Sequence, residues 1–439
     1  MSRNKLVVIG GGLAGVEAAW QAARHGIEVD LLEMRPGTMT PAHRTGWLAE
    51  LVCSNSLGSD MPTTAGGTLK EEMRLLGSLI LECASKARVG AGSALAVDRE
   101  LFARLVTERV EQHERINVIR QESCSIPGGV PVVVATGPLT SPCMAKEISL
   151  LTGAEYLYFY DAVAPIITRE SIDESKVFWA ARYGKGEADY ANCPMDEEEY
   201  QRFWKALVEA EVVPTREFEP LTLFEGCMPI EEMARRGREA LAFGPLRPVG
   251  LKDPGTGRRP YAVVQLRKED PGGTLLNMVG FQTRLKWHEQ RRVFRMIPGL
   301  EEAEFVRYGV MHRNTFINSP RVLKNTLQVK SHPNILFAGQ ITGVEGYTES
   351  AATGIVAGIQ AARIILGQGA IEFPRETIIG SLCHYISTAD PEHFQPMNAN
   401  FGLLQPIDGP RGKMERRLAL SSRALSVMRK FVEIVESGL

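Results

Sequence analysis

Three glycines near the start of the chain, Gly10, Gly12 and Gly15, have the spacing of a loop that binds the pyrophosphate of an adenine dinucleotide. One such glycine allows a tight turn, one lets the backbone approach the phosphates, and one lets a helix pack closely on a strand. Glu33 follows at the end of the next expected strand, where its carboxylate would bind the ribose hydroxyls. These residues predict a dinucleotide site, which at this point could hold FAD or NAD.

The segments around these glycines have the composition of a βαβ unit. Lys5–Ile9 and Ile27–Leu32 are short apolar runs typical of strands, and Val16–Arg24 between them has helical composition. Leu13 and Ala14 fall where a helix N-terminus would present free amide groups to a phosphate, and we count them with the cofactor-binding residues. The competing interpretation, an ordinary glycine-rich turn, does not require strand, helix and terminal acid in this order.

A second glycine-rich segment lies far downstream. Asn334–Ala338 has strand composition and leads into Gly339 and Gln340, and a helix rich in small residues is expected over Ala351–Leu366. This arrangement resembles the C-terminal flavin motif of the glutathione-reductase type of FAD-binding fold, and Val130–Gly137 resembles the strand between its two motifs. Many such flavoproteins have an aspartate where this chain has Gln340, whose amide could still bind a ribityl hydroxyl. The resemblance favours FAD over NAD as the resident cofactor.

The length of the chain implies more than one domain. It has 439 residues, of which 44% are hydrophobic, and a single core does not normally grow to that size. We expect an α/β protein with a Rossmann-like, glutathione-reductase-type FAD-binding fold and an inserted smaller α+β domain. The FAD-binding domain would comprise residues 1–153 and 288–439, ending in a basic helix, and the insertion residues 154–287. Within the insertion, Asp196–Val212 is expected to form a helix with Asp196 as its N-cap.

Composition indicates where the protein works and which partners it can bind. The formal net charge of −2 gives no overall attraction to nucleic acid, so an RNA partner would need local basic patches. No stretch approaches the roughly 18 apolar residues of a membrane-spanning helix, so we expect a cytoplasmic protein without membrane contact. Seven cysteines without close CxxC pairs argue against a disulfide framework and against a structural zinc site, and no metal is expected.

Two cysteines have surroundings that suit chemistry. Cys53 comes shortly after the first βαβ unit and is expected near the flavin. Cys227 directly precedes an expected helix with Pro229 at its first position, where a thiolate would be stabilised by the helix N-terminus. The remaining cysteines are expected to be small buried residues: Cys83, Cys124, Cys143, Cys193 and Cys383.

Four motifs resemble one particular family. They are Leu-Val-Cys-Ser-Asn-Ser at 51–56, Phe-Glu-Gly-Cys-Met-Pro-Ile-Glu at 224–231, Gly-Gln-Ile-Thr-Gly-Val-Glu-Gly-Tyr at 339–347 and Phe-Gln-Pro-Met-Asn-Ala-Asn-Phe-Gly at 394–402. Together they resemble the TrmFO family, the folate- and FAD-dependent tRNA (uracil-5-)methyltransferases. The similarity extends from the first strand to about Leu404, and it is more specific than a general FAD signature.

The resemblance implies a reaction. Methylenetetrahydrofolate would donate a one-carbon unit, which passes through reduced FAD to C5 of the T-loop uridine at tRNA position 54, giving 5-methyluridine. NAD(P)H would supply the reducing equivalents. Uracil C5 is a poor nucleophile until a thiolate adds to C6, and the resemblance assigns that addition to Cys227. Cys53 resembles the second essential thiol, as base or as protector of the flavin adduct, Tyr347 the aromatic that stacks on the isoalloxazine, and His312 is expected to stack on the folate pterin.

Two basic segments could contact tRNA phosphates. Arg284 and Lys286 lie in a segment that mixes cations with aromatic residues, and Arg416 and Arg417 lie in the basic tail. The alternative for both segments is the solvated face of a helix, which is the common role of such residues.

Other functions share parts of this pattern. One is a flavin-dependent modification of the wobble uridine together with a partner protein, and another is a non-catalytic flavin-bearing module that binds tRNA. A third is a plain NAD(P)H-dependent flavin oxidoreductase that does not use folate. The Phe-Glu-Gly-Cys-Met-Pro motif and the brief C-terminal tail disfavour the wobble-uridine enzyme.

Overall fold

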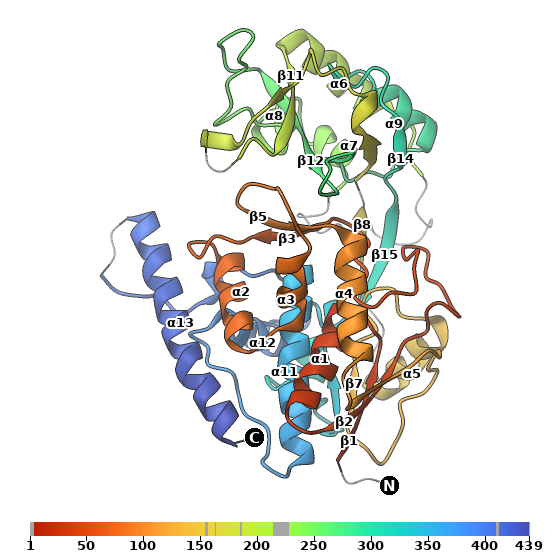
Figure 1. The fold of residues 1–439 in the computed structure, drawn as a ribbon, viewed down its shortest axis with the longest axis vertical. Coiled ribbons are helices and arrows are strands. Elements are labelled where there is room, and N and C mark those ends of the chain that lie inside the picture. Colours follow the sequence, from red (N-terminus) through yellow and green to blue (C-terminus); the bar gives the residue numbers. More distant parts are fainter. Residues whose placement is uncertain are drawn as a thin grey trace.

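The computed structural model describes residues 4–153, 157–162, 164–184, 187–213, 228–409 and 412–438, and of residues 157–162, 311–313 and 438 only the backbone. Within these residues the chain forms two bodies. One is built on a parallel sheet and the other on an antiparallel sheet, and strands β8 (Leu157–Ala162) and β15 (Met311–Phe316) lie between them (Figure 1). The α/β fold class expected from the sequence is confirmed.

The first body is organised around a parallel sheet. In the described part of the chain its strands follow the order β16-β7-β1-β2-β6, and each neighbouring pair is parallel. Leu6 and Val8 face one core of the first body, whereas Val7 and Ile9 face the other, so β1 is apolar on both sides. The strands are β1 (Lys5–Ile9), β2 (Glu28–Leu32), β6 (Ile116–Ile119), β7 (Val132–Val134) and β16 (Ile335–Phe337).

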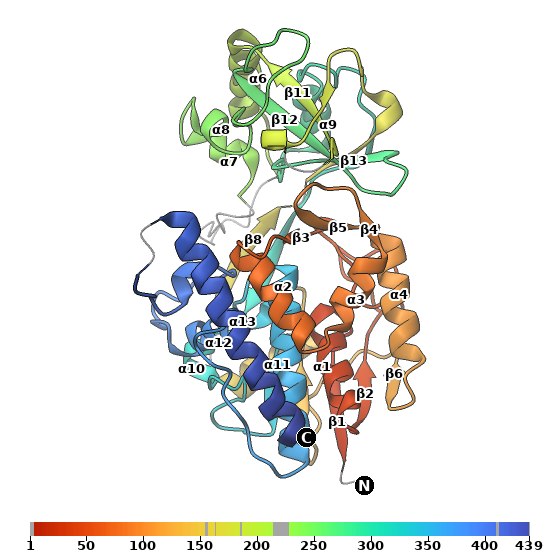
Figure 2. The same ribbon diagram turned by 60° about the vertical axis from the view of Figure 1, so that its left-hand side comes forward.

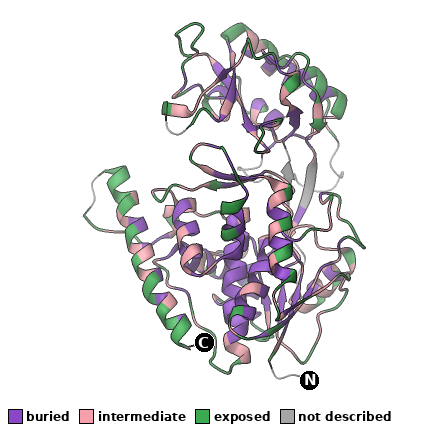
Figure 3. Cartoon of the chain, viewed as in Figure 1, coloured by how far each residue is buried: buried purple, intermediate pink, exposed green. Residues whose placement is uncertain are grey.

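Helices cover both faces of this sheet. α1 and α11 are the most deeply buried of them, as the purple ribbon in Figure 3 shows. They pack at backbone distance because a Cβ at Gly354 would lie 2.2 Å from the carbonyl oxygen of Ala14, and one at Gly358 would lie 2.5 Å from that of Ala18. The helices of this body are α1 (Leu13–Arg24), α2 (Ala65–Leu75), α3 (Leu79–Lys86), α4 (Arg99–Glu111), α5 (Pro142–Thr152), α10 (Ser319–Val322), α11 (Tyr347–Ile365), α12 (Ile378–Thr388) and α13 (Lys413–Gly438).

The C-terminal helix α13 lies on the outside of the first body, beside α2 (Figure 2). Its buried residues recur at helical spacing, and Ser421 hydrogen-bonds Thr68 of α2 at 3.0 Å between the two hydroxyl oxygens. A small antiparallel sheet, in the order β3-β5-β4, faces the second body. Its strands are β3 (Ser56–Ser59), β4 (Arg88–Val89) and β5 (Ala94–Val97), and the buried hydrophobic residues of α13 are Leu420, Ala424, Met428, Phe431 and Val435.

The second body has an antiparallel sheet with helices on it. The strand order in the described residues is β10-β11-β12-β13-β9-β14. Asp196 caps α6 as expected, and it forms a capping box with Glu199. The strands are β9 (Ile166–Thr168), β10 (Phe178–Trp179), β11 (Tyr190–Met195), β12 (Ala262–Lys268), β13 (Leu275–Met278) and β14 (Phe305–Arg307), and the helices are α6 (Glu197–Glu209), α7 (Ile230–Arg235), α8 (Ala240–Phe243) and α9 (Trp287–Phe294).

The packing bears on where the insertion ends. Val293 and Phe294 of α9 belong to the core of the second body, and β14 pairs with β9 in its sheet. We therefore propose that the chain returns to the first body after β14, near residue 308, rather than at residue 287.

No helix among the described residues combines the length and the apolar character that crossing a membrane requires.

Candidate functional site

A cavity lies at the carboxyl ends of the parallel strands, where α/β folds bind their ligands. Its wall combines the N-terminal glycine loop with a segment more than 300 residues further along the chain. Eight residues singled out from the sequence line it: Gly10, Gly12, Leu13, Ala14, Glu33, Gly339, Gln340 and Tyr347.

The three glycines of the loop have different structural roles. Gly10 has a φ of +107°, and a Cβ there would lie 2.4 Å from the carbonyl oxygen of Ala135. Gly15 is not part of the cavity wall, and a Cβ there would lie 1.7 Å from the carbonyl oxygen of Gly10. Gly12 lines the cavity, and no protein atom lies within 4 Å of the position its Cβ would take. Gly10 and Gly15 therefore serve the packing of the protein, whereas Gly12 leaves room for a ligand at the N-terminus of α1.

Glu33 is fixed at the end of β2 by several donors. Its Oε2 accepts the Gly11 amide at 2.7 Å, and its Oε1 accepts the Arg35 amide at 3.0 Å and Arg35 Nε at 2.8 Å. Burial raises the pKa of Glu33, but the hydrogen bonds and charge of Arg35 and the Gly11 amide outweigh it, so the pKa is lowered. The side chain is therefore a carboxylate, which can still accept a hydrogen bond from the hydroxyl group of a ligand in the cavity.

The downstream wall comes from the start of α11. The sequence placed this helix at Ala351, but it begins at Tyr347, so the amides of its first turn lie close to the cavity. Gln340 Nε2 donates to Glu345 Oε2 at 2.7 Å, an interaction that orients the Gln340 amide. Ser350 also lines the cavity. The sequence analysis did not name it as a site residue, because it placed Ser350 in a loop before the expected helix.

Cys53 lies next to this cavity and is tied to it through Tyr347. The Tyr347 hydroxyl accepts hydrogen bonds from the backbone N–H groups of Cys53, at 2.7 Å, and Ser54, at 3.2 Å. The neighbouring residue Val52 lines the cavity itself. Burial raises the pKa of the Tyr347 phenol, so the hydroxyl is neutral and stays an acceptor for both amides.

Three arginines surround the segment that carries Cys53. Arg99 Nη2 donates to the Cys53 carbonyl at 3.3 Å, Arg267 Nη2 donates to Ser54 Oγ at 2.9 Å, and Arg307 donates to the carbonyl of Val52. They come from α4, β12 and β14, so both bodies contribute to this cluster. The positive charge that they bring favours an anion at this point.

Sequence reasoning missed these arginines, and their burial distinguishes them. Burial and the nearby charges of Arg99 and Arg44 lower the pKa of Arg307 to about 10. Arg267 is only 8% exposed, within the largely buried strand β12, and Glu269 forms an ion pair with Arg99 at 2.9 Å. An arginine inside a buried strand was the one signal in the sequence.

The structure does not describe the side chains of two other predicted site residues, Cys227 and His312. Cys227 lies outside the described residues. The next residues are described: Met228 is buried, and Pro229 is the N-cap of α7 rather than its first residue. The backbone of His312 lies in β15 and pairs with Asp161 of β8, and its side chain is not described. Both assignments remain predictions.

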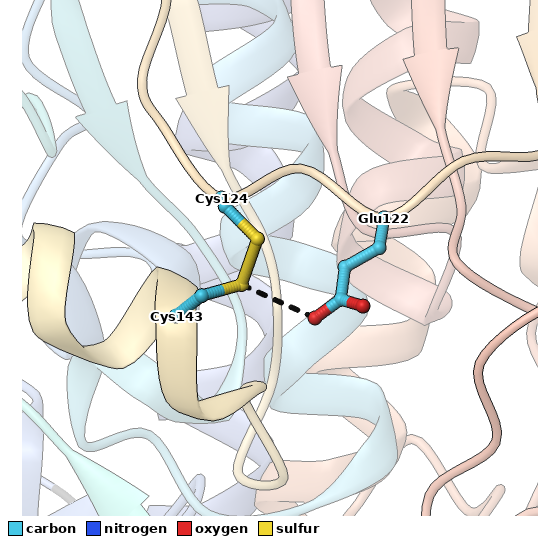
Figure 4. Close-up of side chains that lie close together, drawn as sticks. All are labelled: Glu122, Cys124 and Cys143. Atoms are coloured by element: carbon cyan, nitrogen blue, oxygen red, sulfur yellow. Dashed lines mark hydrogen bonds between the residues drawn. A yellow bond between two sulfur atoms is a disulfide. The ribbon is translucent and has the colours of Figure 1, made fainter.

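One expectation about the cysteines was wrong. Cys124 and Cys143 were expected to be buried thiols, but Cys124 is exposed and the two are joined by a disulfide (Figure 4). The pair escapes sequence reasoning because Cys143 lies 19 residues after Cys124, on a separate element, and no short motif marks it. Cys83, Cys193 and Cys383 are buried free cysteines as expected, and burial raises the pKa of Cys83 and of Cys383 to about 12.

The basic residues proposed for RNA contact differ in their availability. Arg284 is mostly buried and forms an ion pair with Glu232, so its charge is not presented to solvent. Lys286 is 43% exposed and pairs with Glu211 at 2.5 Å. Arg416 is exposed, and together with Arg417 it lines a groove at the start of α13.

The fold and the cavity define an α/β protein of the Rossmann-like, dinucleotide-binding class. A family model described as glucose inhibited division protein A matches residues 5–369. Among solved structures, GidA of Aquifex aeolicus superposes with a TM-score of 0.72 and 18% identity, and the match covers 98% of this chain and 73% of that one. At that identity the likeness supports the fold alone.

Curated relatives narrow the family. The protein named methylenetetrahydrofolate–tRNA-(uracil-5-)-methyltransferase TrmFO of Pelotomaculum thermopropionicum is 60% identical over 434 residues, which are 99% of this chain and 99% of the relative. Proteins of the same name from Heliobacterium modesticaldum and Moorella thermoacetica are 59% and 60% identical and cover 97% of this chain. The chain belongs to the TrmFO family.

Replacing either of two glycines by alanine should separate packing from ligand binding. Gly15→Ala places a methyl group against a backbone carbonyl, and we expect it to destabilise the protein by about 1–3 kcal/mol or more. Gly12→Ala meets no protein atom, so its melting temperature should stay near that of the parent, while its affinity for FAD falls by about tenfold or more. Thermal unfolding and FAD titration measure the two effects. Equal losses of stability in both variants would contradict these roles.

Tyr347→Phe should loosen the segment that carries Cys53. The change leaves two backbone N–H groups without their acceptor, at a cost of about 1 kcal/mol, which corresponds to about fivefold faster exchange of those amides. Hydrogen exchange followed by mass spectrometry of the 51–56 segment measures it. Tyr385→Phe is the matched control, since it removes a hydroxyl that binds Gln395 instead. Unchanged exchange in Tyr347→Phe would show that the hydroxyl does not hold this segment.

Proposed function

We propose that this protein transfers a one-carbon unit from methylenetetrahydrofolate to C5 of the T-loop uridine at position 54 of tRNA. The product is 5-methyluridine, FAD is the cofactor, and NAD(P)H is the reductant. The observation that carries the proposal is the 60% identity to a TrmFO protein over 99% of both chains. The geometry adds support, because a cysteine segment and a dinucleotide-type cavity share one side chain, Tyr347.

The residues of the cavity fit FAD. Gly12 and the first turn of α1 would hold the pyrophosphate, and Glu33 would accept hydrogen bonds from the ribose. Gln340 would bind a hydroxyl of the ribityl chain, and the ring of Tyr347 would lie against the isoalloxazine. When bound and reduced, FAD would supply the N5 position through which the one-carbon unit passes.

The two proposed cysteines act on the uracil and beside the flavin. We propose that the Cys227 thiolate forms a bond to C6 of uracil, which breaks the C5–C6 double bond and moves its electrons onto the C4 carbonyl as an enolate. C5 then becomes nucleophilic and bonds to the methylene carbon, and it must lose its proton before the thiolate leaves. The two electrons that turn the methylene into a methyl group would come from NAD(P)H. Cys53 would act as that base or would protect the flavin, and its place beside the cavity and among three arginines supports the proposal.

The folate and tRNA surfaces are proposals of the same kind. His312, in a strand between the two bodies, would stack on the pterin. Lys286, Arg416 and Arg417 would contact tRNA phosphates. Trp287, next to Lys286, is 63% exposed and stacks on Tyr308 with ring centroids 5.4 Å apart, so it offers a free face to a base.

Transfer of label from methylene-labelled tetrahydrofolate into unmodified tRNA tests the proposed reaction. With FAD and NADPH present, the parent should form labelled 5-methyluridine and Cys227→Ala should form none, because uracil C5 is not activated without the thiolate. Flavin absorbance should show that Cys227→Ala still holds its cofactor.

Cys83→Ala is the matched control for loss of a cysteine. Burial raises the pKa of Cys83 to about 12, so its thiol is protonated and unreactive, and this variant should keep the parent's product yield. A parent that binds and reduces flavin but transfers no label would overturn the proposed reaction and favour the wobble-uridine enzyme or the binding module.

Reversing two charges on α13 tests the proposed tRNA contact. Arg416→Glu with Arg417→Glu should weaken tRNA binding and lower the slope of log affinity against log salt by about 2, one for each lost phosphate contact. Arg429→Glu with Lys430→Glu is the control, because it makes the same charge change at exposed positions further along the helix. The same loss in both double variants would mean that only overall charge matters, and no loss in the first would remove the tail from the site.

A further inference from the structure

The disulfide joins two segments that the sequence does not connect. Cys124 lies in the loop after β6, and Cys143 lies in the first turn of α5. Figure 4 shows the bridge together with Glu122, whose Oε1 lies 3.2 Å from Cys143 Sγ. Neither cysteine belongs to the chemistry proposed above.

Both joined segments form part of the cavity wall. Glu122 and Ser123 line the cavity directly before Cys124, and Ser141 and Met144 line it on either side of Cys143. The bridge therefore lies immediately behind the wall and holds its two sides together. When it opens, the loop after β6 is no longer tied to the start of α5.

The surroundings of the pair suit reversible oxidation. Cys124 is exposed, so a small reagent in solvent can reach its sulfur. Cys143 lies in the first turn of α5, where a helix N-terminus favours the thiolate in the reduced protein, and Glu122 Oε1 lies within hydrogen-bonding distance of its sulfur. Thr38 Oγ1 donates to the other Glu122 oxygen at 3.1 Å and so orients the carboxylate.

We propose that Cys124 and Cys143 form a reversible dithiol–disulfide site that controls how tightly the cavity retains its dinucleotide. Oxidation joins the loop after β6 to the start of α5 and slows release of the ligand. Reduction removes this link and speeds release. The inference rests on the proposed function in one respect, namely that FAD is the dinucleotide.

The oxidation is a thiol–disulfide exchange with a small-molecule disulfide. The thiolate of one cysteine attacks a sulfur of that reagent, which breaks the reagent's S–S bond and releases one thiol. The second cysteine then attacks the mixed disulfide, forms the Cys124–Cys143 bond and releases the other thiol. The two protein thiols lose two electrons and two protons, and the reagent gains them as two thiols. A reducing thiol reverses both steps.

Coupling between the bridge and the ligand must be reciprocal. If the disulfide strengthens FAD binding by some factor, bound FAD shifts the dithiol–disulfide equilibrium toward the disulfide by the same factor. This gives the inference two independent readouts, of which neither is catalytic activity.

The experiment uses the full-length holoprotein in its two redox states. One sample is equilibrated with a small-molecule disulfide and the other with a phosphine reductant, and differential alkylation with mass spectrometry establishes the state of Cys124 and Cys143. FAD release is then followed by flavin fluorescence after dilution. We expect release to be about fivefold faster or more from the reduced protein, in the range of typical couplings between sites.

Variants assign the effect to this pair. Cys124→Ser with Cys143→Ser should release FAD at the fast rate after either treatment, because it cannot form the bridge. This variant keeps Cys53 and Cys227, so a redox dependence that persisted in it would arise at those cysteines and would overturn the proposal. Cys383→Ala, which removes a buried thiol elsewhere, should respond to redox state as the parent does.

Other outcomes separate this inference from the proposed function. Equal release rates in both redox states would overturn the redox control and leave the proposed function untouched. Cysteines that stay reduced and bind a zinc ion after treatment with the disulfide would do the same. Failure to bind FAD at all would overturn the proposed cofactor, and with it the proposed redox control of its release. In a redox titration, an equilibrium constant that FAD does not shift would contradict the coupling even if release rates differed.

Discussion

The close approach of α1 and α11 is the constraint on which the rest of the site depends. These helices start more than 300 residues apart in sequence, and their backbones touch because Gly354 and Gly358 have no Cβ where Ala14 and Ala18 present their carbonyls. The contact brings the β1–α1 loop and the start of α11 to one cavity. The strands of the second body, β9 to β14, lie in the sequence between these two helices, so the chain leaves the first body and returns to it before α11 begins.

The same contact determines where Cys53 lies. Because α11 begins at Tyr347, the phenol at its N-terminus is placed against the backbone of Cys53 and Ser54. The cysteine segment thus depends on a helix whose own position depends on small residues. Local interactions of the 51–56 segment would not produce this geometry.

The predictable parts of the structure were those set by local sequence. The βαβ unit, Glu33 and the Asp196 cap depend on neighbouring residues, and each lies where the pattern put it. The start of α11 was misplaced because glycines, Thr348 and Ser350 read as a loop, while packing against α1 extends the helix through them. The Cys124–Cys143 bridge and the arginines around Cys53 arise from tertiary contacts between segments far apart in the chain, which no spacing rule encodes.

Local charge, rather than net charge, governs the region where the two bodies meet. The chain carries a formal charge of −2, yet Arg99, Arg267 and Arg307 converge on one short segment, and Glu269 pairs with Arg99 there. Burying several cations together is unfavourable unless other groups compensate, and the carbonyls of Val52 and Cys53 supply only partial negative charge. An anion at this junction would complete the compensation. The cluster therefore links the two bodies through hydrogen bonds. The same arginines make the side of the cavity near Cys53 favourable for a negative charge.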